Sequence, residues 1–267
     1  MGEYRTGFTR IKLTLAYVGT AFSGWQIQGD GPHRPRTVQG ELEAALTRLT
    51  GLPMRVHGAG RTDAGVHADM QAAHFDVPAK LARINWPLAL RGLLPDDLVI
   101  LGAEEVPPDF HARFSAAGKI YAYAFSLDSV PLPPRWGPFV WRVGPLDLRL
   151  MDEAAAALLG EHDFAAFQNS GHSAGNTVRR LDELVRLPLC PSPEPPDFPP
   201  GRYWFWRFTG NGFLKQMVRN LMGFLVEAGR GRLRPADAAA LFAAGKRKDS
   251  PFPTAPAHGL TLIRVLY

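Results

Sequence analysis

The chain has 267 residues, enough for one or two domains, and its 46% apolar and 21% charged residues are ordinary for a globular protein. No run of about 18 apolar residues predicts a membrane span, and the N-terminal stretch lacks the apolar core of an export signal. The single cysteine, Cys190, excludes an internal disulfide and a multi-cysteine zinc site. We therefore expect a cytoplasmic protein.

The net charge of +5 permits a polyanionic partner but does not require one. The basic residues are 24 arginines and 6 lysines, and arginine binds phosphate through paired hydrogen bonds and stacks on bases. The joint abundance of Arg, Ala, Gly and Pro is equally typical of GC-rich coding. Charge alone therefore leaves both explanations open.

The first part of the chain predicts the element order β-α-β-β-α-β. Residues 10–18 alternate apolar and polar, which is typical of a half-buried strand. Thr37 is a good N-cap for a helix with a leucine stripe that ends at Gly51. Strands over 54–57, 70–77 and 98–106, and a helix capped by Asn85, complete this part. Two prolines at 107–108 then indicate a boundary between domains 1–108 and 109–267.

The second part repeats this plan loosely. Its sequence predicts strands over 119–125, 177–187, 202–209 and 258–267, and helices after Asp147, over 213–229 and over 235–244. A proline-rich stretch at 188–201 is predicted to be an irregular hairpin insertion. The whole pattern favours an α+β fold of two βαββαβ-like halves, which form a mostly antiparallel sheet with helices on one side.

The stretch from Gly58 to Ala68, GAGRTDAGVHA, has the strongest chemical pattern. Its three glycines disfavour a helix and suit a tight, exposed turn, which carries Arg61, Thr62 and Asp63. The Arg61 guanidinium can keep the Asp63 carboxylate ionised, and an ionised carboxylate on a preorganised loop can act as a nucleophile. The same pattern also fits a surface turn with a solvated Arg–Asp pair.

This stretch resembles the signature of tRNA pseudouridine synthases of the TruA type, in which the Asp of GRTDAGVHA is catalytic. That residue is Asp63 here. Further runs similar to the family occur in order, namely Y-x-G-x-x-F-x-G-W-Q at 17–26, V-Q-G-E at 38–41, F-H-A-R-F-S-A at 110–116, M-V-R-N at 217–220 and G-L-x-L at 259–262. The resemblance therefore covers nearly the whole chain.

The resemblance implies that the protein converts uridine to pseudouridine in the anticodon stem-loop of tRNA, at positions 38, 39 and/or 40. Asp63 would be the nucleophile, and no cofactor, nucleotide or metal would be needed. Tyr121 matches the family tyrosine that lies under the target uracil, and its hydroxyl could also move a proton from C5. By alternation alone, Tyr121, Tyr123 and Phe125 would form a core stripe.

The resemblance also implies roles for five further residues. Arg61 and Arg219 would form ion pairs with the catalytic carboxylate, although a lone helical arginine is usually solvated. His111, Arg113 and Leu260 would contact the substrate at an active-site cleft between the halves, although the segment with His111 equally fits a surface linker. Family members act as homodimers, so the implied partners are tRNA and a second copy of this chain, with no membrane.

Two other classes of function remain open. A metal hydrolase could use His57, His67, Asp69 and His74, although no HExxH or similar compact motif occurs. An RNA-binding protein without catalysis could keep the fold and a basic cleft, although the intact candidate site residues argue against it. The sequence does not decide whether Asp63 attacks the ribose or removes a proton, which uridines are modified, or what residues 188–201 do.

Overall fold

The structure is a computed structural model that describes residues 7–29, 31, 34–128, 133–169, 175–189, 202–245, 247 and 250–267. Cys190 and most of the proline-rich segment lie outside the described residues. The chain divides into two compact units: the first comprises Met1–Ala117 and Leu262–Tyr267, and the second comprises Gly118–Thr261. The domain boundary expected after residue 108 stays a prediction.

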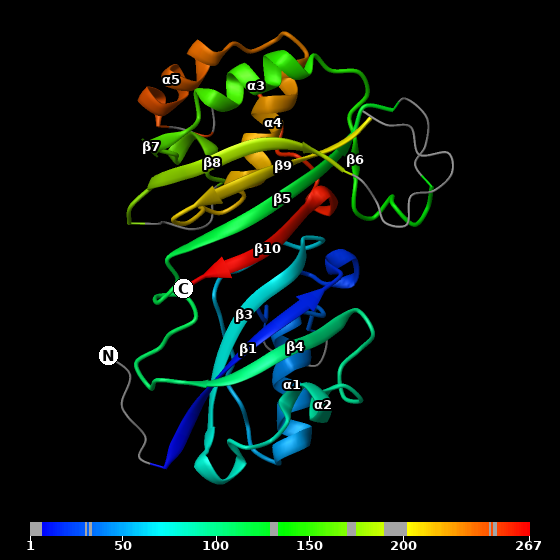
Figure 1. The fold of residues 1–267 in the computed structure, drawn as a ribbon, viewed down its shortest axis with the longest axis vertical. Coiled ribbons are helices and arrows are strands. Elements are labelled where there is room, and N and C mark those ends of the chain that lie inside the picture. Colours follow the sequence, from blue (N-terminus) through cyan, green and yellow to red (C-terminus); the bar gives the residue numbers. More distant parts are fainter. Residues whose placement is uncertain are drawn as a thin grey trace. The chain divides into compact units, whose positions relative to one another are not determined.

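The first unit has the element order that its sequence predicts. The elements are β1 (Phe8–Tyr17), α1 (Val38–Thr50), β2 (His57–Gly58), β3 (His67–Pro78), α2 (Trp86–Leu90) and β4 (Leu98–Val106). Strand β1 lies in the middle and pairs antiparallel with both β3 and β4 (Figure 1). The last strand, β10 (Leu260–Leu266), enters this unit at Leu262 and lies next to β3.

Helix α1 begins and ends where the sequence predicts. The Thr37 hydroxyl accepts a hydrogen bond from the Gly40 N–H at 3.2 Å, and Gly51 ends the helix with a positive φ of 70°. Leu42 and Leu46 on its apolar stripe are fully buried. Local signals therefore fix the bounds of this helix.

A strand is expected over residues 54–57, but in the structure β2 comprises only His57–Gly58. Val56 explains the difference. Its N–H donates to Glu43 Oε1 at 2.9 Å, and its carbonyl accepts from Gln39 Nε2 at 3.2 Å. Because side chains of α1 satisfy both backbone groups, Val56 makes no bond to a neighbouring strand.

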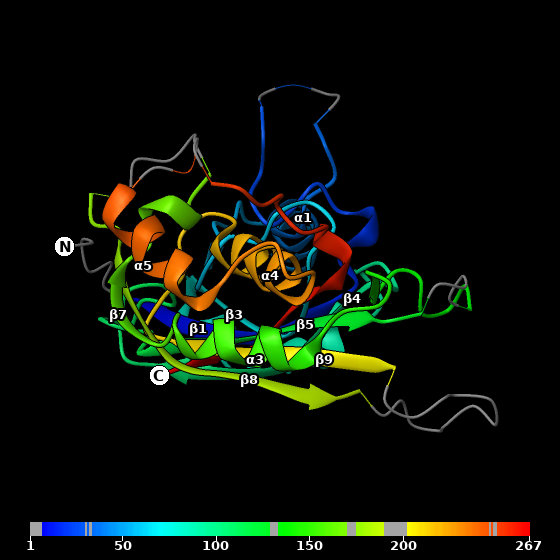
Figure 2. The ribbon, with the colours of Figure 1, turned by 90° about the horizontal axis from the view of Figure 1, so that it is seen from above.

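The second unit contains β5 (Gly118–Ser126), β6 (Trp141–Arg142), α3 (Leu148–Ala156), β7 (Gly160–Asp163), β8 (Val178–Pro188), β9 (Tyr203–Gly210), α4 (Met217–Gly229) and α5 (Pro235–Ala244). The strands lie in the order β5-β9-β8-β7 with antiparallel pairs, and β6 pairs with β5 in parallel (Figure 1). Helix α3 packs against α4, α5 and β8 (Figure 2). Single turns of 3-10 helix occupy Gly19–Ala21 and Ala79–Leu81 in the first unit, and Ala165–Phe167 and Ala257–Gly259 in the second.

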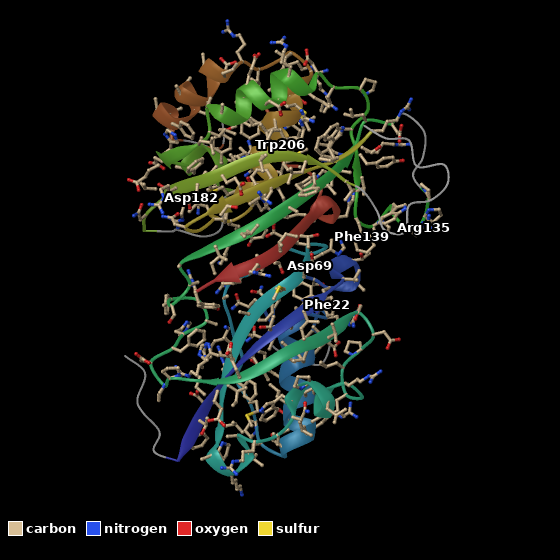
Figure 3. All side chains as sticks on the ribbon, viewed as in Figure 1. Phe22, Asp69, Arg135, Phe139, Asp182 and Trp206 are labelled. Atoms are coloured by element: carbon tan, nitrogen blue, oxygen red, sulfur yellow. The ribbon has the colours of Figure 1, made fainter. Side chains whose placement is uncertain are left out.

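Helix α4 forms the centre of the second unit's core. Every residue of this helix is buried except Arg219, and Trp206 on β9 is almost fully buried as well (Figure 3). The helix begins at Met217 rather than at the expected residue 213, because Gln216 adopts a left-handed φ of 61° that an α-helix cannot contain.

The expected α+β fold with a mostly antiparallel sheet is confirmed, since β5–β6 is the one parallel pair among those with a described register. The expected cleft between the halves stays a prediction. No helix in the described ranges is both long and apolar enough to cross a membrane.

Candidate active site

The loop of residues 58–68 is tied through its backbone to the segment that follows β1. The Thr62 carbonyl accepts from the Trp25 N–H at 3.1 Å, and the Gly65 N–H donates to the Phe22 carbonyl at 3.3 Å. Phe22 itself lies close to the end of β1 (Figure 3). Two stretches that are about 40 residues apart in sequence therefore form one rigid backbone unit.

A tight turn presents Asp63. The Val66 N–H donates to the Asp63 carbonyl at 3.2 Å, and Gly65 at the third position of the turn has a φ of 81°. A type II turn requires such a φ, which glycine adopts without strain. Asp63 is half-buried at the first corner, while Arg61 two residues earlier is exposed.

Two glycines after β1 let the loop approach closely. A Cβ atom on Gly19 would lie 2.0 Å from the Val66 carbonyl oxygen. Gly24 has a φ of 101°, and a Cβ there would lie 2.8 Å from the Thr62 carbonyl oxygen. The glycines of the run at 17–26 are therefore the surface on which the Asp63 loop rests.

Side chains below the loop add three hydrogen bonds. The Tyr17 hydroxyl lies 2.8 Å from Thr62 Oγ1, and burial raises the pKa of Tyr17 to about 12. His67 Nδ1 accepts from the Gly19 N–H at 3.0 Å, and Gln71 Nε2 donates to the Gly60 carbonyl at 3.2 Å. All three groups lie on β1 or β3, so the sheet supports the loop.

Tyr121 lies on β5 with only 8% of its surface exposed. Its ring meets the edge of Phe213, with ring centroids 5.1 Å apart and an angle of 80° between the planes. Tyr121 pairs with Phe208 of β9 in the sheet. The strand and Phe213 thus fix the orientation of the Tyr121 ring.

Arg219 and Tyr123 bind neighbouring carbonyls of one segment. Arg219 Nε donates to the Ala255 carbonyl at 2.7 Å, and the Ala255 N–H donates back to the Arg219 carbonyl at 3.1 Å. The Tyr123 hydroxyl donates to the Pro256 carbonyl at 2.6 Å, and burial raises the pKa of Tyr123. Tyr123, which alternation assigns to the core, therefore also positions the segment that orients Arg219. Leu260 follows this segment and is buried.

A network of polar side chains surrounds the first turn of α4. Asn220 is fully buried, and its Nδ2 donates to the Phe167 carbonyl at 2.7 Å and to Asn169 Oδ1 at 3.0 Å. The Thr254 hydroxyl donates to Asn220 Oδ1 at 2.7 Å, and Arg247 Nε donates to Asn169 Oδ1 at 3.0 Å. No local pattern in the sequence indicates this network, because its members are far apart in the chain and each is a common surface residue type.

The predicted site residues lie partly in the first unit and partly in the second. The first unit holds Arg61, Asp63, His111 and Arg113, and the second holds Tyr121, Arg219 and Leu260. In the described part of the chain, Arg61 forms no ion pair with a carboxylate. The catalytic and substrate-binding roles of these residues stay predictions.

The four metal-capable residues of the hydrolase alternative have other contacts. His57 and His74 stack with ring centroids 5.0 Å apart, and His67 accepts a backbone hydrogen bond. Asp69 lies on β3 (Figure 3), and burial raises its pKa. Within the described residues, no group of three or more His, Cys, Asp or Glu side chains is arranged to hold a metal ion.

Comparison with known proteins assigns the chain to a family. The family model described as tRNA pseudouridine synthase matches residues 14–115 and 154–267. The chain is 48% identical to tRNA pseudouridine synthase A of Nitratidesulfovibrio vulgaris strain Miyazaki F, over 97% of this chain and 99% of that protein. It is 51% identical to tRNA pseudouridine synthase A of Solidesulfovibrio magneticus, over 97% of this chain and 91% of that protein. The chain therefore belongs to the tRNA pseudouridine synthase family.

Among solved structures, a Cbf5-Nop10-Gar1 complex is similar at 14% identity and a TM-score of 0.36, over 81% of this chain and 44% of that chain. This similarity is too low to support the assignment to the family. The prediction of a tRNA pseudouridine synthase, an isomerase, is confirmed by the family. Family membership, rather than the arrangement of the histidines, decides against the metal hydrolase.

Proposed function

We propose that this chain converts uridine to pseudouridine in the anticodon stem-loop of tRNA, at one or more of positions 38, 39 and 40, with the Asp63 carboxylate as its nucleophile. The proposal is supported above all by the turn that holds Asp63. The backbone of the turn is fixed by hydrogen bonds and by close contact with Gly19, while the side chain is only half-buried. Such a carboxylate is preorganised and accessible to a substrate.

The reaction is an isomerisation in which the bond between the ribose C1′ and the uracil N1 breaks and a bond from C1′ to C5 forms. The proton on C5 leaves, and N1 gains one, so no redox step and no group donor is involved. As the nucleophile, Asp63 attacks C1′, which requires an ionised carboxylate at a fixed place.

The detached uracil must stay bound while it turns. The Tyr121 ring is held in place by β5 and by Phe213, so it offers a flat surface for stacking. Stacking of a base on an aromatic side chain contributes about 1–3 kcal/mol. The Tyr121 hydroxyl is the candidate acceptor of the C5 proton.

The two arginines of the signature runs are proposed to stabilise the Asp63 carboxylate. Arg219 is oriented by the hydrogen bond from its Nε to Ala255, whereas Arg61 is exposed on the loop itself. A cation near a carboxylate favours the ionised form. His111, Arg113 and Leu260 are proposed to contact the RNA.

We further propose that the protein acts in the cytoplasm as a homodimer that binds tRNA. The name shared by the relatives supports tRNA as the substrate. The surplus of basic residues supports phosphate contacts with the RNA backbone. Sedimentation of the purified chain with and without tRNA would measure the number of copies in the complex.

Chemical mapping of pseudouridine tests the function directly. Unmodified tRNA is incubated with the protein and EDTA, beside the Asp63→Asn variant. New pseudouridine in the anticodon arm with the wild type alone would support the reaction, its region and the nucleophile together. Bound tRNA without product from either protein would instead favour an RNA-binding protein without catalysis.

A further inference from the structure

Phe114 is the most exposed of the large apolar side chains that the structure describes, with 75% of its surface accessible. It lies in the loop between β4 and β5, outside the loop that carries Asp63. A phenylalanine ring gains hydrophobic free energy when a flat partner covers it. A single exposed apolar residue is common, so its setting decides whether it has a role.

The loop that carries this ring is firmly attached to the first unit. The His111 N–H donates to Ser115 Oγ at 2.9 Å, and the Ser115 N–H donates to the His111 carbonyl at 2.8 Å. The buried Ala112 donates its N–H to His74 Nδ1 at 3.1 Å and accepts from the Tyr267 hydroxyl at 2.7 Å. The exposed ring is therefore held in place before any partner binds, which lowers the entropic cost of binding.

A chain of aromatic rings supports Phe114 from below. Its ring centroid lies 4.4 Å from that of His111, and the His111 ring lies 4.7 Å from that of the buried His74. His111 Nδ1 accepts from the N–H groups of Arg113 and Phe114 at 3.1 and 3.4 Å. His111 is therefore neutral with its proton on Nε2, and burial lowers its pKa in agreement.

One guanidinium group lies over the ring. The Arg113 guanidinium carbon lies 5.5 Å from the Phe114 ring centroid. A second exposed cation, Arg55, lies two residues before His57, whose ring centroid is 5.7 Å from that of His111. In the part of the chain that the structure describes, neither Arg55 nor Arg113 pairs with a carboxylate. The surface thus combines one aromatic face with unneutralised guanidinium groups.

We propose that Phe114 and Arg113 form a stacking site for an unpaired nucleobase of the bound RNA, with the guanidinium groups on the adjoining phosphates. An aromatic face beside cations fits a base and its phosphate, which together present a flat ring and negative charge. Bases within a helix do not expose their faces, so the site takes a base of the loop or of another single-stranded part. The inference rests on the proposed function, because it takes the substrate to be tRNA.

Substitutions of Phe114 in the full-length chain test the site. Phe114→Leu removes the ring but keeps an apolar side chain, and Phe114→Trp keeps an aromatic face. Leu88→Ala is the control, since Leu88 is 68% exposed on α2 of the same unit. Phe114→Leu should raise the Kd for unmodified tRNA by about 5- to 150-fold, whereas Phe114→Trp and the control should bind like the wild type.

A second comparison separates stacking from other contacts. Phe114→Leu should weaken binding of an anticodon stem-loop hairpin but leave binding of a blunt RNA duplex of equal length unchanged. Equal weakening of both RNAs, or unchanged binding of both, would overturn the proposal. A changed oligomeric state of Phe114→Leu in sedimentation would also overturn it, because the ring would then belong to a protein interface.

Failure of the stacking site and failure of the proposed function give different results. If Phe114 forms no stacking site, Phe114→Leu should bind and modify tRNA like the wild type. If the proposed function is wrong, the wild type should form no pseudouridine, whatever the affinities of the Phe114 variants for tRNA.

Discussion

The Asp63 loop in the first unit and the start of helix α4 in the second are held in different ways. Backbone contacts fix the Asp63 loop, where carbonyl oxygens of the loop pack against Gly19 and Gly24. Side chains fix the start of α4, where amide and hydroxyl groups around Asn220 bond to one another.

The difference predicts which substitutions each region tolerates. The Asp63 loop packs against glycine, so there is no room for an added methyl group at that glycine. Loss of one side-chain hydrogen bond should change the position of this loop little. A helix start that rests on buried amides loses stability when one of them is removed, because the partners are left without hydrogen bonds.

Asp63→Asn should lower turnover by on the order of 10⁴-fold or more, as for removal of other nucleophiles, while fold and tRNA affinity persist. The amide has nearly the shape of the carboxylate but lacks its charge. Single-turnover formation of pseudouridine, with circular dichroism and tRNA binding beside it, measures the effect. Turnover close to that of the wild type would rule out Asp63 as the nucleophile.

Gly19→Ala should lower turnover by about 100-fold, because its Cβ would lie 2.0 Å from the Val66 carbonyl and must displace the Asp63 loop. Gly92→Ala is the matched control, since no atom lies within 4 Å of a Cβ at that position. Turnover at saturating tRNA, compared between the two variants, measures the effect. Equal activity of both would show that the contact with Gly19 does not fix the loop.

Asn220→Ala should destabilise the protein by about 1–3 kcal/mol, because Asn169 and the Phe167 carbonyl lose a buried partner. Urea unfolding followed by tryptophan fluorescence measures the loss. Turnover should also fall, since the next residue back along the helix is Arg219. Full stability of this variant would show that the network is not needed for the start of α4.

Tyr17→Phe should have the smallest effect, a loss of about 1 kcal/mol in stability with little change in turnover. The hydroxyl bonds to Thr62 Oγ1 beneath the Asp63 loop, but the backbone of the loop is held independently by Trp25 and Phe22. The same urea titration and turnover measurement apply. A loss of turnover as large as that of Gly19→Ala would show that the Tyr17 hydroxyl, rather than the backbone contacts, holds the Asp63 loop.

Local signals in the sequence determined several parts of this protein. Thr37 and Gly51 set both ends of α1, because capping depends on residues within one turn of the helix. Alternation predicted β1 and β5, and a nearly all-apolar run predicted β9, each to within two residues. The run GAGRTDAGVHA and the other family-like runs indicated the family, and comparison over nearly the full length of the chain confirmed it.

Features that depend on residues far apart in the chain could be seen only in the folded structure. The Val56 N–H donates to Glu43 and its carbonyl accepts from Gln39, both on α1, and no local pattern predicts that these side chains replace a neighbouring strand. The network around Asn220 joins residues 34 to 78 positions apart. Local propensity depends on a few neighbouring residues, whereas such contacts exist only once the chain has brought distant polar groups into a shared, buried space.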